Sequence, residues 1–225
     1  MTDGVDLDGE VRRVDPDRWL ASRFITDPRR RADVVALYAF DHQLARAGVA
    51  ATNPLAAEIR LVWWREAVDE VFAGGAIRRH PTVEALATAV RAWSLPRAPM
   101  EAVIEAYIDV LQTPWFEIAE ALAWTGQAQG SLAGLAARVL GGEAAQAEPA
   151  GLVWGLTLMR RAGKAGGAEF ETGLRKGLAD ARRAARALPA AAFPAALCAT
   201  LARADGASEL EKRARLTLAA LTGRL

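Results

Sequence analysis

The sequence predicts an all-α fold. Of its 225 residues 52% are hydrophobic, and only two are tyrosine. Alanine and leucine dominate, runs of β-branched residues are short, and apolar residues recur at helical spacing between breaks at proline or glycine. This apolar content is enough for a substantial core, so we expect residues 15–225 to form one helical domain.

Residues 1–14 are expected to form a disordered tail. Aspartate and glycine recur there with few large apolar side chains, a composition typical of mobile termini. Order is expected to begin at Asp15-Pro16-Asp17, where an aspartate cap precedes a proline at the first helical position. The acidic start also differs from the basic leader of a secreted or mitochondrial protein.

Two long helices are expected next, over residues 29–47 and 54–72. The first follows a second Asp-Pro signal at Asp27 and carries an apolar stripe in which Asp41 lies. The second ends at Gly74-Gly75. Proline and glycine then separate further helices expected over residues 81–93, 99–111, 115–125, 127–140 and 149–162.

The C-terminal part predicts a basic helix over residues 169–188 and a final helix ending near residue 221. A capping box at Ser208 and Glu211 begins the final helix. The charge-free stretch between them, residues 188–202, is shorter than the roughly 20 residues that cross a bilayer. We expect it to form a buried pair of helices.

Two motifs in the N-terminal half carry a resemblance. Residues 37–46 read LYAFDHQLAR, and residues 58–71 read EIRLVWWREAVDEV. Together they resemble the squalene/phytoene synthase family, in which a YAF helix leads into a D-x-x-x-D motif and an L-x-W-W-R-E-A helix follows. The resemblance covers about residues 17–142 and implies an isoprenoid-synthase-type helical bundle, here shortened at the C-terminus.

The carboxylates that this family's chemistry needs are mostly missing. The motif begins at Asp41, but Ala45 stands four residues later, and no Asp or Glu lies between Pro149 and Gly167, where a second aspartate motif is implied. Magnesium that neutralises a diphosphate leaving group is normally held by carboxylates. We therefore assign no catalytic residue beyond the motif remnant Asp41 and no metal ligand, and we expect no cofactor. Mg²⁺ would be needed only if the protein is an active enzyme.

The resemblance also implies a central cavity. The residues expected to line it are Tyr38, Asp41, Ala45, Trp63, Trp64, Arg65, Leu156 and Arg160. Other interpretations stay open, because Asp41 could instead pair with a buried donor and the tryptophans could simply fill the core. Arg160, Arg161 and Lys164 could neutralise a diphosphate without a metal, but cations are also favourable near a helix C-terminus for structural reasons.

Three functions are therefore considered. The leading one is a non-catalytic protein with degenerate aspartate motifs and a binding or assembly role, similar to the mitochondrial complex I assembly factor of this family. The second is an active prenyltransferase that condenses prenyl diphosphates to squalene- or phytoene-like products in terpenoid biosynthesis. The third is a binding module for a prenyl or quinone lipid.

Charge and cysteine content limit the partners. The formal net charge of +1 provides no overall field that would attract nucleic acid. The expected partners are a protein or a prenyl-type lipid, with peripheral membrane contact through Arg175, Arg182, Arg183 and Arg186. One cysteine, Cys198, cannot form an internal disulfide. With no signal peptide or transmembrane helix expected, the predicted location is the cytoplasm or the periphery of the inner membrane.

Overall fold

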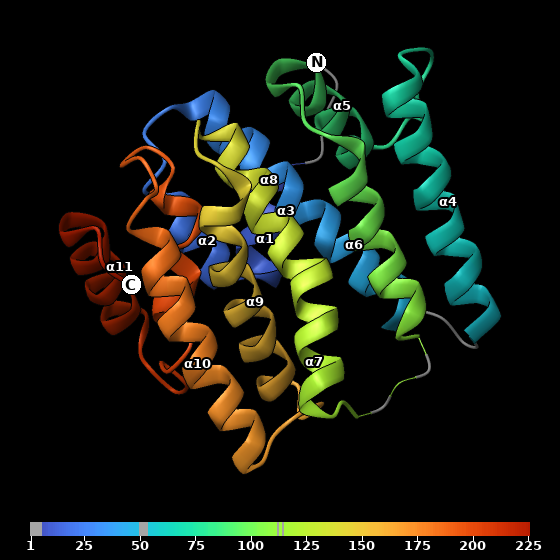
Figure 1. Cartoon of the computed structure of the whole chain (residues 1–225). Helices are drawn as coiled ribbons and strands as arrows, with labels where there is room; N and C mark the ends of the chain where they lie inside the picture. Colours follow the sequence, from blue (N-terminus) through green and yellow to red (C-terminus); the bar gives the residue numbers. More distant parts are fainter. Residues whose placement is uncertain (1–5, 50–53, 112, 114) are drawn as a thin grey trace.

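The computed structural model describes residues 6–49, 54–111, 113 and 115–225 (Figure 1). Its described residues form α-helices, 3-10 helices and one π-helix joined by short connections, with no strand among them. The all-α prediction is thus confirmed.

In the N-terminal half, the residues that the structure describes form six α-helices. Their bounds are α1 Leu7–Val14, α2 Pro16–Ser22, α3 Pro28–Val49, α4 Pro54–Ala73, α5 Pro81–Trp93 and α6 Arg97–Asp109. The expected positions of α3, α4 and α5 are confirmed to within two residues at each end. Helix α6 begins two residues earlier than expected, because Pro96 caps it and Pro99 falls in its first turn.

The C-terminal half is built around α9. The bounds are α7 Ile118–Thr125, η1 Gly126–Gly130, α8 Ser131–Val139, α9 Ala144–Arg161, α10 Ala168–Ala185, η2 Phe193–Ala195, η3 Leu197–Leu201 and α11 Glu209–Thr222. The single helix expected over residues 127–140 is instead a π-helix, η1, followed by α8. The stretch 188–202 is largely buried as expected, although its two helices are of the 3-10 type.

Residues 7–14 form helix α1, so the prediction of a disordered tail over residues 1–14 is wrong for this part. Residues 1–5 lie outside the described residues. Asp6 caps α1 at the backbone N–H of Gly9, and Val11 is fully buried against the rest of the molecule. Asp8 accepts hydrogen bonds from Trp19 Nε1 at 2.9 Å and Arg23 at 2.5 Å. These hydrogen bonds hold α1 against α2, although α1 has only a small apolar face.

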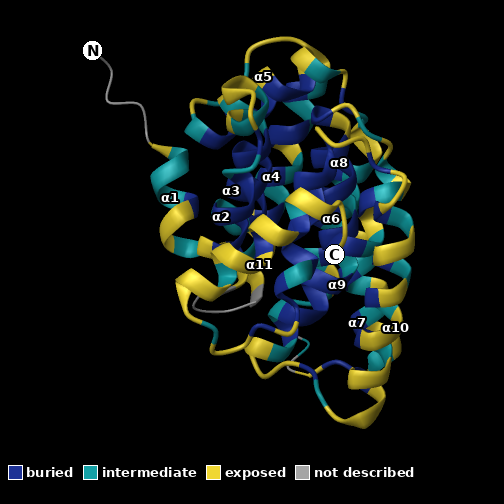
Figure 2. Cartoon of the chain, turned by 90° about the vertical axis from the view of Figure 1, so that its left-hand side faces the viewer, coloured by how far each residue is buried: buried dark blue, intermediate teal, exposed yellow. Residues whose placement is uncertain are grey.

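The core lies between α3 and α9. Helix α3 packs against α1, α4, α5 and α8, while α9 packs against α7, α8, α10 and η1. Figure 2 shows the buried residues concentrated in these inner helices and the exposed ones on α1, α10 and α11. Among the described residues, none of the helices combines the length and the apolar composition that a membrane crossing requires.

Helix α9 begins at Ala144 rather than at Pro149, the expected start. The side chain of Gln146 accepts from the backbone N–H of Glu143 at 3.3 Å and completes a capping box, so the first turn forms before the proline. On the inner face of α9, a Cβ added at Gly151 would lie 2.7 Å from the Cβ of Ala133. Helix α9 can therefore approach η1 and α8 only because this position is glycine.

Candidate functional site

Asp41 lies in the middle of α3 and is only 3% exposed. Its Oδ1 accepts from the hydroxyl of Tyr107 at 2.7 Å and from Nε2 of Gln129 at 2.8 Å. Its Oδ2 accepts from the guanidinium of Arg18 at 2.5 Å. Both carboxylate oxygens are therefore bonded to protein donors, as a buried charge requires.

Arg18 reaches this carboxylate from α2 and is itself 6% exposed. Its guanidinium also pairs with Asp15, donates to Oε1 of Gln129 at 3.1 Å and lies 5.0 Å from the ring centre of Tyr38. Burial lowers the pKa of Arg18, but attraction to Asp15 and Asp41 outweighs it and leaves that pKa well above its ordinary value. Asp15 and Asp41 thus share one buried cation.

Two neighbouring groups remain uncharged near neutral pH. Burial, followed by the negative charge of Asp41, raises the pKa of Tyr107 well above its ordinary value, so its hydroxyl stays a donor. Burial is the largest cause that lowers the pKa of His42. Gln129, on the π-helix η1, completes the group by donating to Asp41 and accepting from Arg18.

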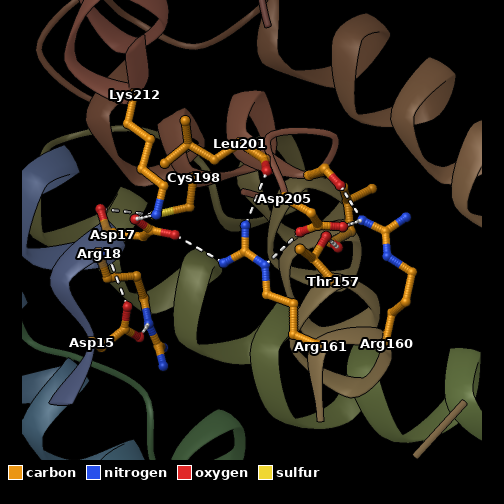
Figure 3. Close-up of polar contacts among 12 residues, drawn as sticks. Asp15, Asp17, Arg18, Thr157, Arg160, Arg161, Cys198, Leu201, Asp205 and Lys212 are labelled. Atoms are coloured by element: carbon orange, nitrogen blue, oxygen red, sulfur yellow. Dashed lines mark hydrogen bonds and ion pairs between the residues drawn. The ribbon is translucent and has the colours of Figure 1, made fainter. Parts of the chain in front are cut away.

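A second set of ion pairs lies beside the first (Figure 3). Asp17 accepts from Arg161 and from Nζ of Lys212, each at 2.8 Å. Arg161 also donates to Asp205 at 2.8 Å, and Arg160 reaches the other oxygen of Asp205 at 2.5 Å. These contacts join α2, α9 and α11 through charges that are already paired.

Both networks border a cavity of about 580 Å³. Its apolar wall comes from α3, α6, α7, α9 and the connection after α6. This wall contains Ala45, Gly48, Val110, Leu111, Phe116, Trp124, Trp154, Leu158 and Met159. The ring centres of Tyr107 and Trp124 lie 5.4 Å apart, edge to face. The cavity therefore has an aromatic and aliphatic wall and a polar end of bonded charges.

The cavity does not fit a magnesium centre of the kind that diphosphate chemistry uses. Both carboxylate oxygens of Asp41 already accept hydrogen bonds from three protein donors. A divalent cation at this position would also be repelled by the positive charge of the Arg18 guanidinium. In the part of the chain that the structure describes, no group of three or more histidine, cysteine or acidic side chains is placed to hold a metal ion.

Comparisons with known proteins place the chain in a family. The squalene/phytoene synthase family matches residues 11–168. The chain belongs to this family. No curated protein matches it in sequence.

Two solved structures of the family's type share the fold. The crystal structure of squalene synthase HpnC from Alicyclobacillus acidocaldarius is 16% identical with a TM-score of 0.69, and the match covers 97% of this chain and 96% of that one. A dehydrosqualene synthase in complex with a ligand is 14% identical with a TM-score of 0.67, covering 94% and 93%. Relative to these two proteins the chain is not shortened at the C-terminus.

The structure brings only some of the expected lining residues to the cavity. Asp41 and Ala45 line it, as the resemblance to this family implied. Tyr38 is buried above Arg18 and Leu156 is fully buried in the core, so neither borders the cavity.

The tryptophan-rich motif faces elsewhere. Trp64 is 5% exposed and packs edge to face on Phe40, with ring centres 5.7 Å apart. Trp63 and Trp64 border a separate surface hollow, and Arg65 pairs with Glu105 at 2.7 Å. The expectation that Trp63, Trp64 and Arg65 line the cavity is therefore wrong, because α4 packs against α3, α5 and α6 and contributes no residue to the cavity wall.

On α9 the expected arginine is displaced by one position. Arg161, with Trp154 and Leu158 at helical spacing, lines the cavity, whereas Arg160 pairs with Asp205 and Glu171 outside it. The principal polar residues that the sequence did not indicate are Arg18, Tyr107 and Gln129. The position of Arg18 directly after the Asp15-Pro16-Asp17 cap is the sequence signal that could have indicated it.

Proposed function

We propose that this protein is a non-catalytic member of the squalene/phytoene synthase family that binds a prenyl-type lipid in its cavity without a metal ion. The observation that carries the proposal is the saturation of Asp41 by Arg18, Tyr107 and Gln129. A carboxylate already bonded in this way stabilises the fold and is not available to bridge metal ions.

The charges of the cavity favour a ligand with a neutral or weakly polar head. Arg18, Arg161 and Lys212 are each paired with an aspartate. Lys164 also borders the cavity and forms no ion pair with a described residue. A diphosphate carries several negative charges. To be neutralised by Arg18, Arg161 or Lys212 it would have to break their existing ion pairs, which would leave buried aspartates without a partner and cost free energy.

The opposite wall favours an isoprenoid chain. Phe116, Trp124 and Trp154 contribute flat apolar surface, and Leu158 and Met159 contribute flexible aliphatic groups. A cavity of about 580 Å³ is within the usual size of small-molecule sites. Transfer of each buried methylene from water contributes about 0.8 kcal/mol, so a prenyl chain gains affinity with length until the cavity is filled.

The active prenyltransferase is the competing function, and an assembly role is the other. Diphosphate ionisation would need metal-holding carboxylates that the described residues do not group together. A respiratory assembly role, implied by the resemblance to the complex I assembly factor, would use the same non-catalytic scaffold. We favour lipid binding because a protein partner alone requires no cavity with an apolar wall.

Calorimetry with farnesol and with farnesyl diphosphate, each in Mg²⁺ and in EDTA, tests the proposal. We expect farnesol to bind equally in both buffers, and we expect Mg²⁺ not to strengthen the binding of farnesyl diphosphate. The variant Ala45→Phe, which fills the cavity wall, should weaken farnesol binding by about tenfold or more.

The matched control is Ala92→Phe on the exposed side of α5, which should leave binding unchanged. Incubation of farnesyl diphosphate with the protein and Mg²⁺ should give no hydrocarbon product above a control without protein. Product that is lost in Asp41→Asn, or farnesol binding that appears only with Mg²⁺, would overturn the proposal.

A further inference from the structure

Helix α11 is apolar on the side that faces solvent. Leu210, Leu218 and Leu221 are 77%, 64% and 82% exposed. At 100° per residue they fall within an arc of about 80°, and the buried Leu216 and Ala219 lie on the opposite side. Three leucines on one outward stripe differ from the scattered apolar residues of an ordinary surface.

Arginines surround this stripe. Arg215 and Arg224 are exposed on or just after α11, and Arg182, Arg183 and Arg186 are exposed at the C-terminal end of α10. The segment that follows α11 meets α10, because Nε of Arg182 donates to the backbone oxygen of Leu225 at 2.9 Å. Figure 1 shows α10 and α11 as outer elements, and Figure 2 shows α11 facing outward. We call these eight residues the α10–α11 surface.

Acidic groups offset only part of this charge, among them Glu211 on α11, which interacts electrostatically with Arg215. Asp180 lies 3.5 Å from Arg183, which remains 78% exposed in its side chain, and Glu209 pairs with Arg213 on α11. Arg182, Arg186, Arg215 and Arg224 form no ion pair with a described residue. The α10–α11 surface is thus a local cationic patch on a chain whose formal net charge is only +1.

We infer that the α10–α11 surface docks on an anionic membrane, with the three leucines in the interface and the arginines at the lipid headgroups. An apolar stripe flanked by arginine is the pattern of helices that lie in the membrane interface. Anionic lipids attract such arginines over about a Debye length, and the leucines then lose their contact with water. A second copy of the chain could cover the leucines, but such a dimer would place the arginines of both copies side by side, where their positive charges repel each other.

Flotation with lipid vesicles tests this inference without reference to any cavity ligand. The protein should float with phosphatidylcholine vesicles that contain about 30% phosphatidylglycerol and much less with phosphatidylcholine alone. Leu218→Ser/Leu221→Ser should lower partitioning by about tenfold at any salt concentration. Arg182→Glu/Arg186→Glu should lower it by at least as much in low salt, and the difference should shrink in high salt.

Two controls match these changes elsewhere on the surface. Leu55→Ser/Ile59→Ser removes exposed apolar groups from α4, and Arg29→Glu/Arg91→Glu reverses exposed charges on α3 and α5. Both should float like the parent protein, and circular dichroism should show all four variants folded. The inference is overturned if the parent does not float, if the controls lose as much as the α10–α11 variants, or if the leucine change only converts a dimer to a monomer.

Discussion

Three donors from distant parts of the chain converge on Asp41. Arg18, Tyr107 and Gln129 are 23, 66 and 88 residues away from it in sequence. The apolar stripe of α3 predicted that Asp41 faces inward and meets a donor, and both expectations are confirmed. Which donors meet it depends on how α2, α6 and η1 pack around α3, so the sequence pattern of α3 alone could not supply them.

Replacing Arg18 by methionine should destabilise the protein strongly. The change leaves Asp41 buried with one of its oxygens unpaired, and removing one partner of a buried pair costs about 3–5 kcal/mol. Urea unfolding followed by circular dichroism measures the free energy of unfolding. The double variant Arg18→Met/Asp41→Asn should recover part of the loss, and Arg175→Met on the exposed face of α10 should cost less than about 0.5 kcal/mol. Equal losses in all three variants would contradict the role of Arg18.

His80 should make stability depend on pH. Its Nδ1 caps α5 by accepting from the backbone N–H of Thr82 at 3.2 Å, and burial lowers its pKa below the ordinary 6.5. The unfolded state therefore binds the proton more readily. The stability that this histidine contributes is complete above pH 6.5 and is lost as the pH falls through its lowered pKa.

The variant His80→Asn keeps a capping side chain without titrating in this range. Its free energy of unfolding should fall less than that of the parent between about pH 7.5 and 5.5. Since burial also lowers the pKa of His42, adding His42→Gln should flatten the dependence further. An unchanged slope in the double variant would show that neither histidine is held in its neutral form by the fold.

Among the helices that the sequence predicted, α9 has the largest shift of a boundary. The end of the helix agrees within one residue with the expected residue 162, but a capping box that starts at Glu143, six residues before Pro149, begins the helix. Its inner face is set by Gly151 and Gly155, which let η1 approach closely enough for Gln129 to reach Asp41. The close approach of η1 fixes which side of α9 faces the cavity. For this reason Arg161 lines the cavity and Arg160 does not.

Gly151→Ala should destabilise the fold and disturb the bonds of Gln129. The added methyl group would overlap the backbone oxygen of Gln129 and the Cβ of Ala133. Overpacking of this kind costs about 1–3 kcal/mol, measurable by thermal or urea unfolding. Gly126→Ala is the matched control, because its Cβ would meet its nearest neighbour at 3.7 Å, and alanine favours a helix. A larger loss in the control would contradict the proposed close packing.

At the scale of the whole molecule, the cavity is assembled from both halves of the chain. Asp15 and Arg18 come from its N-terminal end, Tyr107 from its middle, and Arg161 and Lys212 from its C-terminal half. Paired charges close the polar end, and aromatic side chains form the rest of the wall. The fold is shared with a squalene synthase, and the polar end of the cavity is arranged around Arg18.

Thermal unfolding should therefore respond to a lipid and not to a divalent cation. Farnesol should raise the midpoint Tm in proportion to the logarithm of its concentration, because it binds only the folded state. The Tm in Mg²⁺ should differ by less than about 1 °C from the Tm in a sodium salt of equal ionic strength. The two solutions screen charges equally, so any larger difference would report specific binding of Mg²⁺. A rise in Tm that requires Mg²⁺ would indicate carboxylates that are free to bind it.

The sequence by itself determined the helical class, most helix positions, the family and the inward orientation of Asp41, because these follow from local periodicity, caps and motifs. It failed at α1, where burial of a short polar helix depends on Trp19 and Arg23 of a neighbouring helix. Only the tertiary structure decided which charges meet at the cavity, which face of α9 reaches it and that α4 contributes no residue to its wall. The physical reason is that a buried ion pair and a helix crossing are set by packing between distant segments, and local sequence does not encode their relative rotation.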